Sequence, residues 1–107
     1  MSKTLRVLPA ARMDTVSCFE YLRAQSGAAQ AWHFIASLQE SFDRIQQMPF
    51  IGAVRQFRRA RLRNIRQWPV REFEDYLIFY RVTQERIDIQ RILHSRRNLE
   101  AIFARRD

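Results

Sequence analysis

Apolar residues in the first half of the chain recur at helical spacing after one short alternating segment. That segment, residues 4–8, is typical of a β-strand and ends at Pro9, a residue tolerated in the first turn of a helix. From Pro9 to Ser26, and again from Ala28 to about Met48, apolar positions return every three or four residues, which predicts two helices. Ser26 is predicted to cap the second helix. Because so few residues join them, the helices should pack as an antiparallel hairpin.

After Gly52 the period of the hydrophobic pattern changes from helical to two. The stronger strand candidates are Tyr76–Val82 and Ile87–Leu93, with 83–86 as the hairpin loop between them. Two weaker candidates are Leu62–Ile65 and Val70–Phe73. The second half of the chain is therefore predicted to form a meander of strands.

Alternation along the last predicted strand assigns its side chains to two faces. One face is predicted to carry Ile87, Ile89 and Leu93, and the other Asp88, Gln90, Ile92 and His94. After this strand, residues 98–104 are predicted to form a short terminal helix.

The order strand, helix, helix, strands predicts an α+β fold. We expect a small antiparallel sheet with an N-terminal helical hairpin packed on one face and a short C-terminal helix. The length of 107 residues is that of one domain, so residues 1–107 are predicted to form a single domain. A hydrophobic fraction of 47% excludes a wholly disordered chain.

Charge is the unusual feature of the composition. Nineteen basic residues against eleven acidic ones give a formal net charge of +8, and Lys3 is the only lysine. Between Asp43 and Glu72 the chain has no acidic residue and many arginines. A run of like charge is often just a solvated face, but unbalanced charge adds self-repulsion that solubility does not require. The arginine fork suits phosphate and carboxylate, so we expect an anionic partner: nucleic acid, an acidic protein segment, or both.

Several kinds of chemistry are not expected. The single cysteine, Cys18, rules out an intrachain disulfide and a zinc site built on several thiolates, and its apolar helical setting predicts an inert thiol. Gly27 and Gly52 are the only glycines, and no spacing typical of metal, dinucleotide or P-loop sites occurs, so no metal or cofactor is expected. No apolar run is long enough to cross a membrane, and no signal sequence is evident, so we predict a cytoplasmic protein.

The two histidines differ in position. His33 lies in the middle of a predicted helix, where a structural or exposed role is typical. His94 directly follows the last predicted strand and precedes Arg96 and Arg97. Such a histidine can act as general acid or base in phosphodiester cleavage, or it can be a hydrogen-bonded structural residue. Both interpretations remain open.

The strand segments of the second half resemble those of a known family. Residues 76–82 (YLIFYRV) and 91–97 (RILHSRR), preceded by Leu62-Arg63 and by Val70 with Phe73, are similar to the RelE/ParE superfamily of bacterial toxins from type II toxin–antitoxin systems. In the first half, the strand that ends at Pro9, and Met48-Pro49 followed by Gly52, also agree. The resemblance covers nearly the whole chain and implies a small sheet with a helical hairpin on one side.

The resemblance implies one of two activities. RelE-like members are ribosome-dependent endoribonucleases that cut messenger RNA, and ParE-like members inhibit DNA gyrase. A nuclease would use Arg63 and Arg97 on the phosphate and His94 as acid or base. In RelE-like members a tyrosine of the terminal helix contributes to catalysis, whereas this chain has Phe103, which has no hydroxyl. The ending of the last strand is ParE-like, although Asn98 stands where that branch usually has aspartate.

We therefore expect a ParE-like toxin that inhibits gyrase by binding and not by turnover. Its partners would be DNA gyrase and a cognate acidic antitoxin, partly helical, laid against the helical hairpin and over the basic sheet face in a hetero-oligomer. The alternatives are a RelE-like nuclease acting on ribosome-bound messenger RNA and a degenerate toxin that only binds its antitoxin.

Five arginines are expected to contact the target or the antitoxin: Arg61, Arg63, Arg81, Arg96 and Arg97. Arg81 shares strand parity with Leu77 and Phe79, so an internal structural role with a buried partner is equally open for it.

Overall fold

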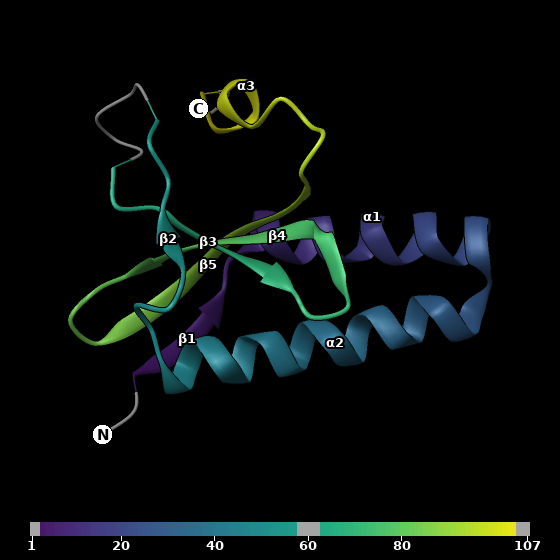
Figure 1. The fold of residues 1–107 in the computed structure, drawn as a ribbon, viewed down its shortest axis with the longest axis horizontal. Helices are drawn as coiled ribbons and strands as arrows, with labels where there is room; N and C mark the ends of the chain where they lie inside the picture. The colour runs from purple at the N-terminus through teal and green to yellow at the C-terminus, as the bar shows by residue number, and fades with distance from the viewer. Residues whose placement is uncertain (1–2, 58–62, 105–107) are drawn as a thin grey trace.

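The structure, a computed structural model, describes residues 3–57 and 63–104, and these form five strands and three helices (Figure 1). In chain order the elements are β1 (Thr4–Val7), α1 (Pro9–Ser26), α2 (Ala28–Gln47), β2 (Ala53–Val54), β3 (Arg66–Val70), β4 (Phe73–Val82), β5 (Arg86–His94) and α3 (Leu99–Ala104).

The strands form one sheet in the order β1-β5-β4-β3-β2. Neighbours along β5, β4, β3 and β2 run antiparallel, as a meander requires, whereas β1 joins the edge of β5 in parallel. The predicted α+β class, with its helical hairpin and short C-terminal helix, is confirmed. The sheet is mixed: the two long helices carry the chain from β1 to β2 at the opposite edge, and the meander then returns to place β5 beside β1 in parallel.

The helical hairpin turns at a single glycine. Gly27 adopts φ +94°, a left-handed conformation that suits a residue without a Cβ, and it is the N-cap of α2. The backbone N–H of Gly27 donates to the carbonyl of Arg23, which closes α1. The prediction that Ser26 caps α2 is wrong, because Ser26 is still the last helical residue of α1 and α2 has no side-chain cap. Figure 1 shows α1 and α2 lying antiparallel on one side of the sheet.

The sheet has an apolar cluster on each face. The larger cluster lies between the hairpin and the sheet, where Phe34, Leu38 and Ile45 of α2 meet Ile78 and Tyr80 of β4. The smaller one lies on the opposite face beneath α3 and comprises Ile65, Phe79, Leu93, Leu99 and Phe103. The short C-terminal helix therefore covers the face that the hairpin leaves open.

A β-bulge reverses the side-chain parity of β5. Phe79 lies opposite Arg91 but Tyr80 lies opposite Ile89, so the residue between them on β5 is extra. As a result Ile92 joins Ile87 and Ile89 in the larger cluster, whereas Leu93 belongs to the smaller one. The predicted faces are thus wrong for Ile92, Leu93 and His94, because strict alternation holds only where the ladder is regular.

The long strands β4 and β5 confirm the two stronger strand predictions, but the weaker ones are displaced. The intervening strand is Arg66–Val70, and the predicted strands on either side of it fall largely in turns. Arg63 and Asn64 form one turn, with φ +69° at Asn64, and Leu62 lies outside the described residues. Glu72 has φ +67° in the tight connection from β3 to β4. Positive φ at both places ends strand geometry locally.

Candidate functional site: basic surfaces at the two ends of the sheet

The predicted basic residues lie near opposite ends of β4. At one end the Arg81 guanidinium donates to the carbonyl of Arg63 over 3.2 Å. At the other end His94 pairs with Tyr76, and Arg96 and Arg97 follow it. Tyr76 and Arg81 are five residues apart on β4, which corresponds to about 16 Å of strand. Arg61 lies outside the described residues.

His94 is held by its neighbours at the end of β5. Its Nδ1 accepts a hydrogen bond from the backbone N–H of Arg96 at 3.1 Å, and its carbonyl accepts from the N–H of Arg97 at 3.0 Å. The ring stands edge-on to Tyr76 with 5.1 Å between the centroids. With Nδ1 as acceptor, the neutral ring carries its proton on Nε2.

A groove of about 650 Å³ lies between α1 and the ends of β4 and β5. Its walls are Asp14, Ser17, Cys18, Tyr21, Tyr76, Arg91, Ile92, Leu93, His94, Arg96 and Arg97. Arg96 and Arg97 are exposed there, and within the described part of the chain their guanidinium groups form no ion pair. Both are therefore available to an anionic partner that reaches this groove.

An ion pair that the sequence did not reveal fixes α1 to β5 beside this groove. Arg91 donates to both carboxylate oxygens of Asp14, at 2.7 Å and 2.8 Å, and the N–H of Ile92 donates to Asp14 at 2.9 Å. The hydrogen bond to Asp14 raises the pKa of Arg91 above its ordinary value. A carboxylate among the apolar positions of a predicted helix is the one signal that could have indicated it.

Cys18, on α1 in the same groove, is not an activated nucleophile. Burial, and then the negative charge of Asp14, raise the pKa of its thiol to about 11 from an ordinary 9.0. The reactive thiolate is therefore scarce at neutral pH, in agreement with the predicted inert thiol. Burial also raises the pKa of Tyr76 across the groove.

Phe103, which stands where a RelE-like nuclease has its tyrosine, is a core residue. It is 8% exposed and packs against Phe57 and Phe79, with ring centroids 5.1 Å and 5.2 Å away. Its ring supports α3 on the sheet and has no group that moves a proton.

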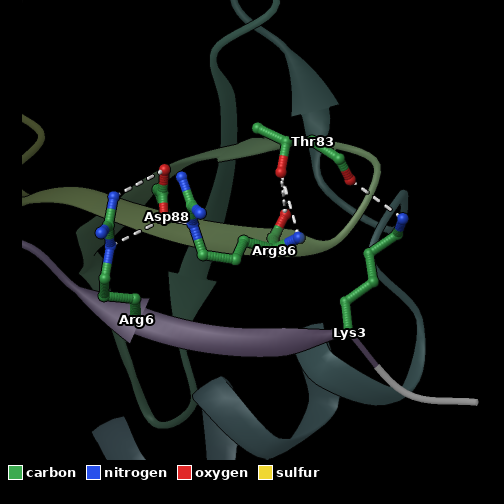
Figure 2. Close-up of polar contacts among 5 residues, drawn as sticks. All are labelled: Lys3, Arg6, Thr83, Arg86 and Asp88. Carbon is green, nitrogen blue, oxygen red and sulfur yellow. Dashed lines mark hydrogen bonds and ion pairs between the residues drawn. The ribbon is translucent and has the colours of Figure 1, made fainter.

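A second cationic group, which the sequence reasoning missed, surrounds Asp88 near the β4–β5 hairpin. Arg6 of β1 donates to Asp88 at 3.2 Å and 3.4 Å, and Arg86 donates to it at 3.3 Å. Lys3 donates to the carbonyls of Thr83 and Gln84 at 2.9 Å and 2.6 Å. Figure 2 shows both guanidinium groups directed at the one carboxylate, and Lys3 reaching the hairpin loop.

Arg81 lies in the same region and makes an internal contact. Its position is directly opposite Asp88 in the register, and its side chain lies on the face of Leu77 and Phe79. It is half-buried, and its hydrogen bond to Arg63 ties the turn before β3 to the sheet. We call Lys3, Arg6, Arg81, Arg86 and Asp88 the Asp88 cluster.

The described residues lack two features that would change the class of protein. Residues 3–57 and 63–104 contain no group of histidine, cysteine and acidic side chains that could hold a metal ion. In the same ranges, no helix has the length and apolar character needed to span a membrane.

Comparisons with known proteins identify the family. A family model described as the ParE toxin of the type II toxin–antitoxin system parDE matches residues 5–99. Among solved structures, a chain of the chromosomal ParDE system from P. aeruginosa superposes with a TM-score of 0.71 at 20% sequence identity, covering 86% of this chain and 95% of that one. At that identity the likeness concerns the fold. No curated protein matches the chain. The family match spans most of the chain, which therefore belongs to the ParE toxin family of type II toxin–antitoxin systems.

Proposed function

We propose that this toxin inhibits DNA gyrase by binding it, and that a cognate acidic antitoxin neutralises the toxin. Family membership supports the toxin–antitoxin role. The observation that carries the choice of binding over cleavage is the dispersal of the residues that a nuclease would need.

Cleavage of a phosphodiester requires phosphate-binding cations and proton-moving groups around one phosphate. Here Arg63 lies near the far end of β4 from His94 and Arg97. The residue of α3 at the position of the nuclease tyrosine is Phe103, in the core. Arg96 and Arg97 form an exposed basic surface beside His94 that suits recognition of an anionic partner better than catalysis.

The antitoxin is proposed to cover the outer side of the helical hairpin. Met13 and Val16 on α1 and Trp32 on α2 are large apolar side chains that the described structure leaves 69%, 57% and 61% exposed. An amphipathic helix could bury this surface, and acidic residues flanking it would offset part of the net charge of +8. Both proteins would act in the cytoplasm as one hetero-oligomer.

Two assays with purified toxin test the proposal: gyrase-catalysed supercoiling of plasmid DNA, and cleavage of message on translating ribosomes. We expect the toxin to inhibit supercoiling, and His94→Ala to retain that inhibition within about twofold because His94 performs no chemistry. Ribosome-dependent cleavage that disappears in His94→Ala would instead establish the nuclease. Tyr80→Phe, a core change remote from His94, is the control for stability effects.

Expression in cells without the antitoxin tests whether the toxin is active at all. We expect growth to stop and to resume when the antitoxin is supplied. Unaffected growth at normal toxin levels would identify a degenerate toxin that only binds its antitoxin.

A further inference from the structure

The sheet face opposite the helical hairpin has a covered half and an open half. Leu77, Phe79 and Leu93 lie beneath α3 in the smaller apolar cluster. Toward the β4–β5 hairpin the same face carries the Asp88 cluster. There Arg6, Asp88 and Arg81 form a row across β1, β5 and β4, because Asp88 is the register partner of both arginines. The row lies on a surface built from regular strands.

The Asp88 cluster carries more positive than negative charge. Arg6 and Arg86 contact Asp88 directly. Counted with Lys3 and Arg81, the four cations outnumber Asp88 and the exposed Glu85 of the hairpin loop by two charges. The carboxylate of Asp88 is only 11% exposed, whereas the Arg6 and Arg86 side chains are 50% and 44% exposed. Asp88 thus holds the two guanidinium groups in place from below while leaving their outer sides to solvent. Fork-shaped donors held in this way lose little freedom when they bind an anion.

The surroundings of the cluster favour a polyphosphate over a protein partner. The core of a protein interface is normally rich in large apolar side chains. The large apolar side chains that the described structure exposes lie on α1, on α2 and in residues 48–54, and none lies on β1, β4 or β5. A nucleic-acid backbone needs no such apolar centre, because its contacts are charge and hydrogen bonds to phosphate.

The cations lie at more than one place on this face, as contacts to successive phosphates require. The guanidinium groups of Arg6 and Arg86 meet at the Asp88 carboxylate, whereas the backbone of Arg81 lies two strand spacings from that of Arg6, about 10 Å away. We propose that the Asp88 cluster binds the sugar–phosphate backbone of double-stranded DNA. The biological role rests on the proposed gyrase inhibition, because the DNA would be the segment that gyrase holds, whereas the binding itself is a property of the toxin alone.

Fluorescence anisotropy with a fluorescein-labelled 20-base-pair duplex, over a series of KCl concentrations, tests this. Arg86→Gln removes one cation, but Asp88 keeps Arg6 as its ion-pair partner. We therefore expect this variant to fold. We expect affinity to fall about eightfold at 0.1 M salt, and the slope of log K against log salt to decrease by about one. Asp88→Asn removes the opposing charge but keeps an acceptor oxygen that can still hold the two guanidinium groups, so it should tighten binding.

Arg12→Gln on α1 and Arg44→Gln on α2 are the matched controls. Both arginines are exposed, form no ion pair within the described residues, and carry the same charge, but they lie on the helical hairpin. They should leave the salt slope unchanged. Equal losses in all three arginine variants would mean that only net charge matters and would overturn the proposal. Weaker binding by Asp88→Asn, or tighter binding to single-stranded RNA of the same length, would also overturn it.

The supercoiling assay separates this inference from the proposed function. A toxin that inhibits gyrase while Arg86→Gln binds the duplex as wild type does would refute the DNA-binding site alone. A toxin whose duplex binding follows the pattern above but which leaves gyrase active would refute the proposed function alone.

Discussion

The hydroxyl of Tyr80 occupies the space that a side chain on residue 52 would need. The N–H of Gly52 donates to this oxygen at 2.8 Å, and the hydroxyl in turn donates to the carbonyl of Pro49 at 2.8 Å. A Cβ at Gly52 would lie 2.6 Å from the hydroxyl and 2.7 Å from the carbonyl oxygen of Gln67. The connection from α2 to β2 is thus fastened to the centre of the sheet through one buried tyrosine.

Gly52→Ala should lower the free energy of unfolding by roughly 1–3 kcal/mol through overpacking, as measured by urea denaturation. Tyr80→Phe should lower it by a similar 1–3 kcal/mol, because the Gly52 N–H and the Pro49 carbonyl lose their partner. The double variant should lose less than the sum, since removing the hydroxyl relieves the closest contact of the new methyl group. Strict additivity would contradict this account.

The ion pair between Asp14 and Arg91 should contribute to stability far more than an exposed pair. Asp14→Ala leaves the Arg91 guanidinium and the Ile92 N–H without their acceptor on a partly buried surface, so we expect a loss of roughly 3 kcal/mol. Glu20→Ala, which breaks the exposed pair with Arg23, is the matched control and should change stability by less than about 1 kcal/mol. Urea denaturation measures both, and equal losses would contradict the prediction.

The Cys18 thiol should react slowly with iodoacetamide in the folded protein. A pKa of about 11 instead of 9.0 lowers the thiolate fraction at pH 8 about a hundredfold. In 6 M urea the same thiol should react at the rate of an ordinary cysteine. Equal rates in the folded and unfolded chains would show that the thiol is not shielded.

The raised pKa of Cys18 also predicts the direction of a pH effect on stability. Below pH 9 the thiol is protonated in both states, and its contribution to stability is complete. Between pH 9 and pH 11 the unfolded chain releases the proton while the folded chain keeps it, so stability falls as the pH rises. Cys18→Ala should show a smaller fall over that interval in thermal melts.

Asn98 should act as the N-cap of α3. Its Oδ1 accepts a hydrogen bond from the N–H of Ala101 at 3.1 Å, so Asn98→Ala should cost about 1 kcal/mol. Asn98→Asp keeps an acceptor at the same position and should retain stability. A loss of the same size in both variants would show that the amide group has another role.

Periodicity predicted the elements with long, regular patterns and failed where one residue breaks the regularity. α2, β4 and β5 follow from apolar spacing because each buries a continuous face, and α1 follows from the same spacing although Ala11 is its only fully buried residue. The bulge opposite Phe79 and Tyr80 reverses the faces of Ile92 and Leu93, and no pattern in the residues signals it. The position of β3 was mispredicted because Asn64 and Glu72 have positive φ values, which end strand geometry on either side of it. The conformation of a single residue leaves little trace in the hydrophobic pattern.

The basic surfaces were only partly predictable. The cluster of His94, Arg96 and Arg97 is contiguous in the sequence, so the sequence could indicate it. Arg6 and Asp88 meet only because β1 pairs with β5, a contact between residues 82 positions apart. Such long-range contacts depend on the order of the strands in the sheet, and composition does not indicate them.

The pairing of β1 with β5 also sets when the toxin can be complete during synthesis. β1 leaves the ribosome among the first segments of this domain, yet its only strand neighbour in the described structure is the last strand of the sheet. Until β5 emerges, β1 has no ladder and Arg6 has no carboxylate partner. The sheet of a nascent toxin therefore stays incomplete until β5 has emerged, so the first strand is among the last to find its place.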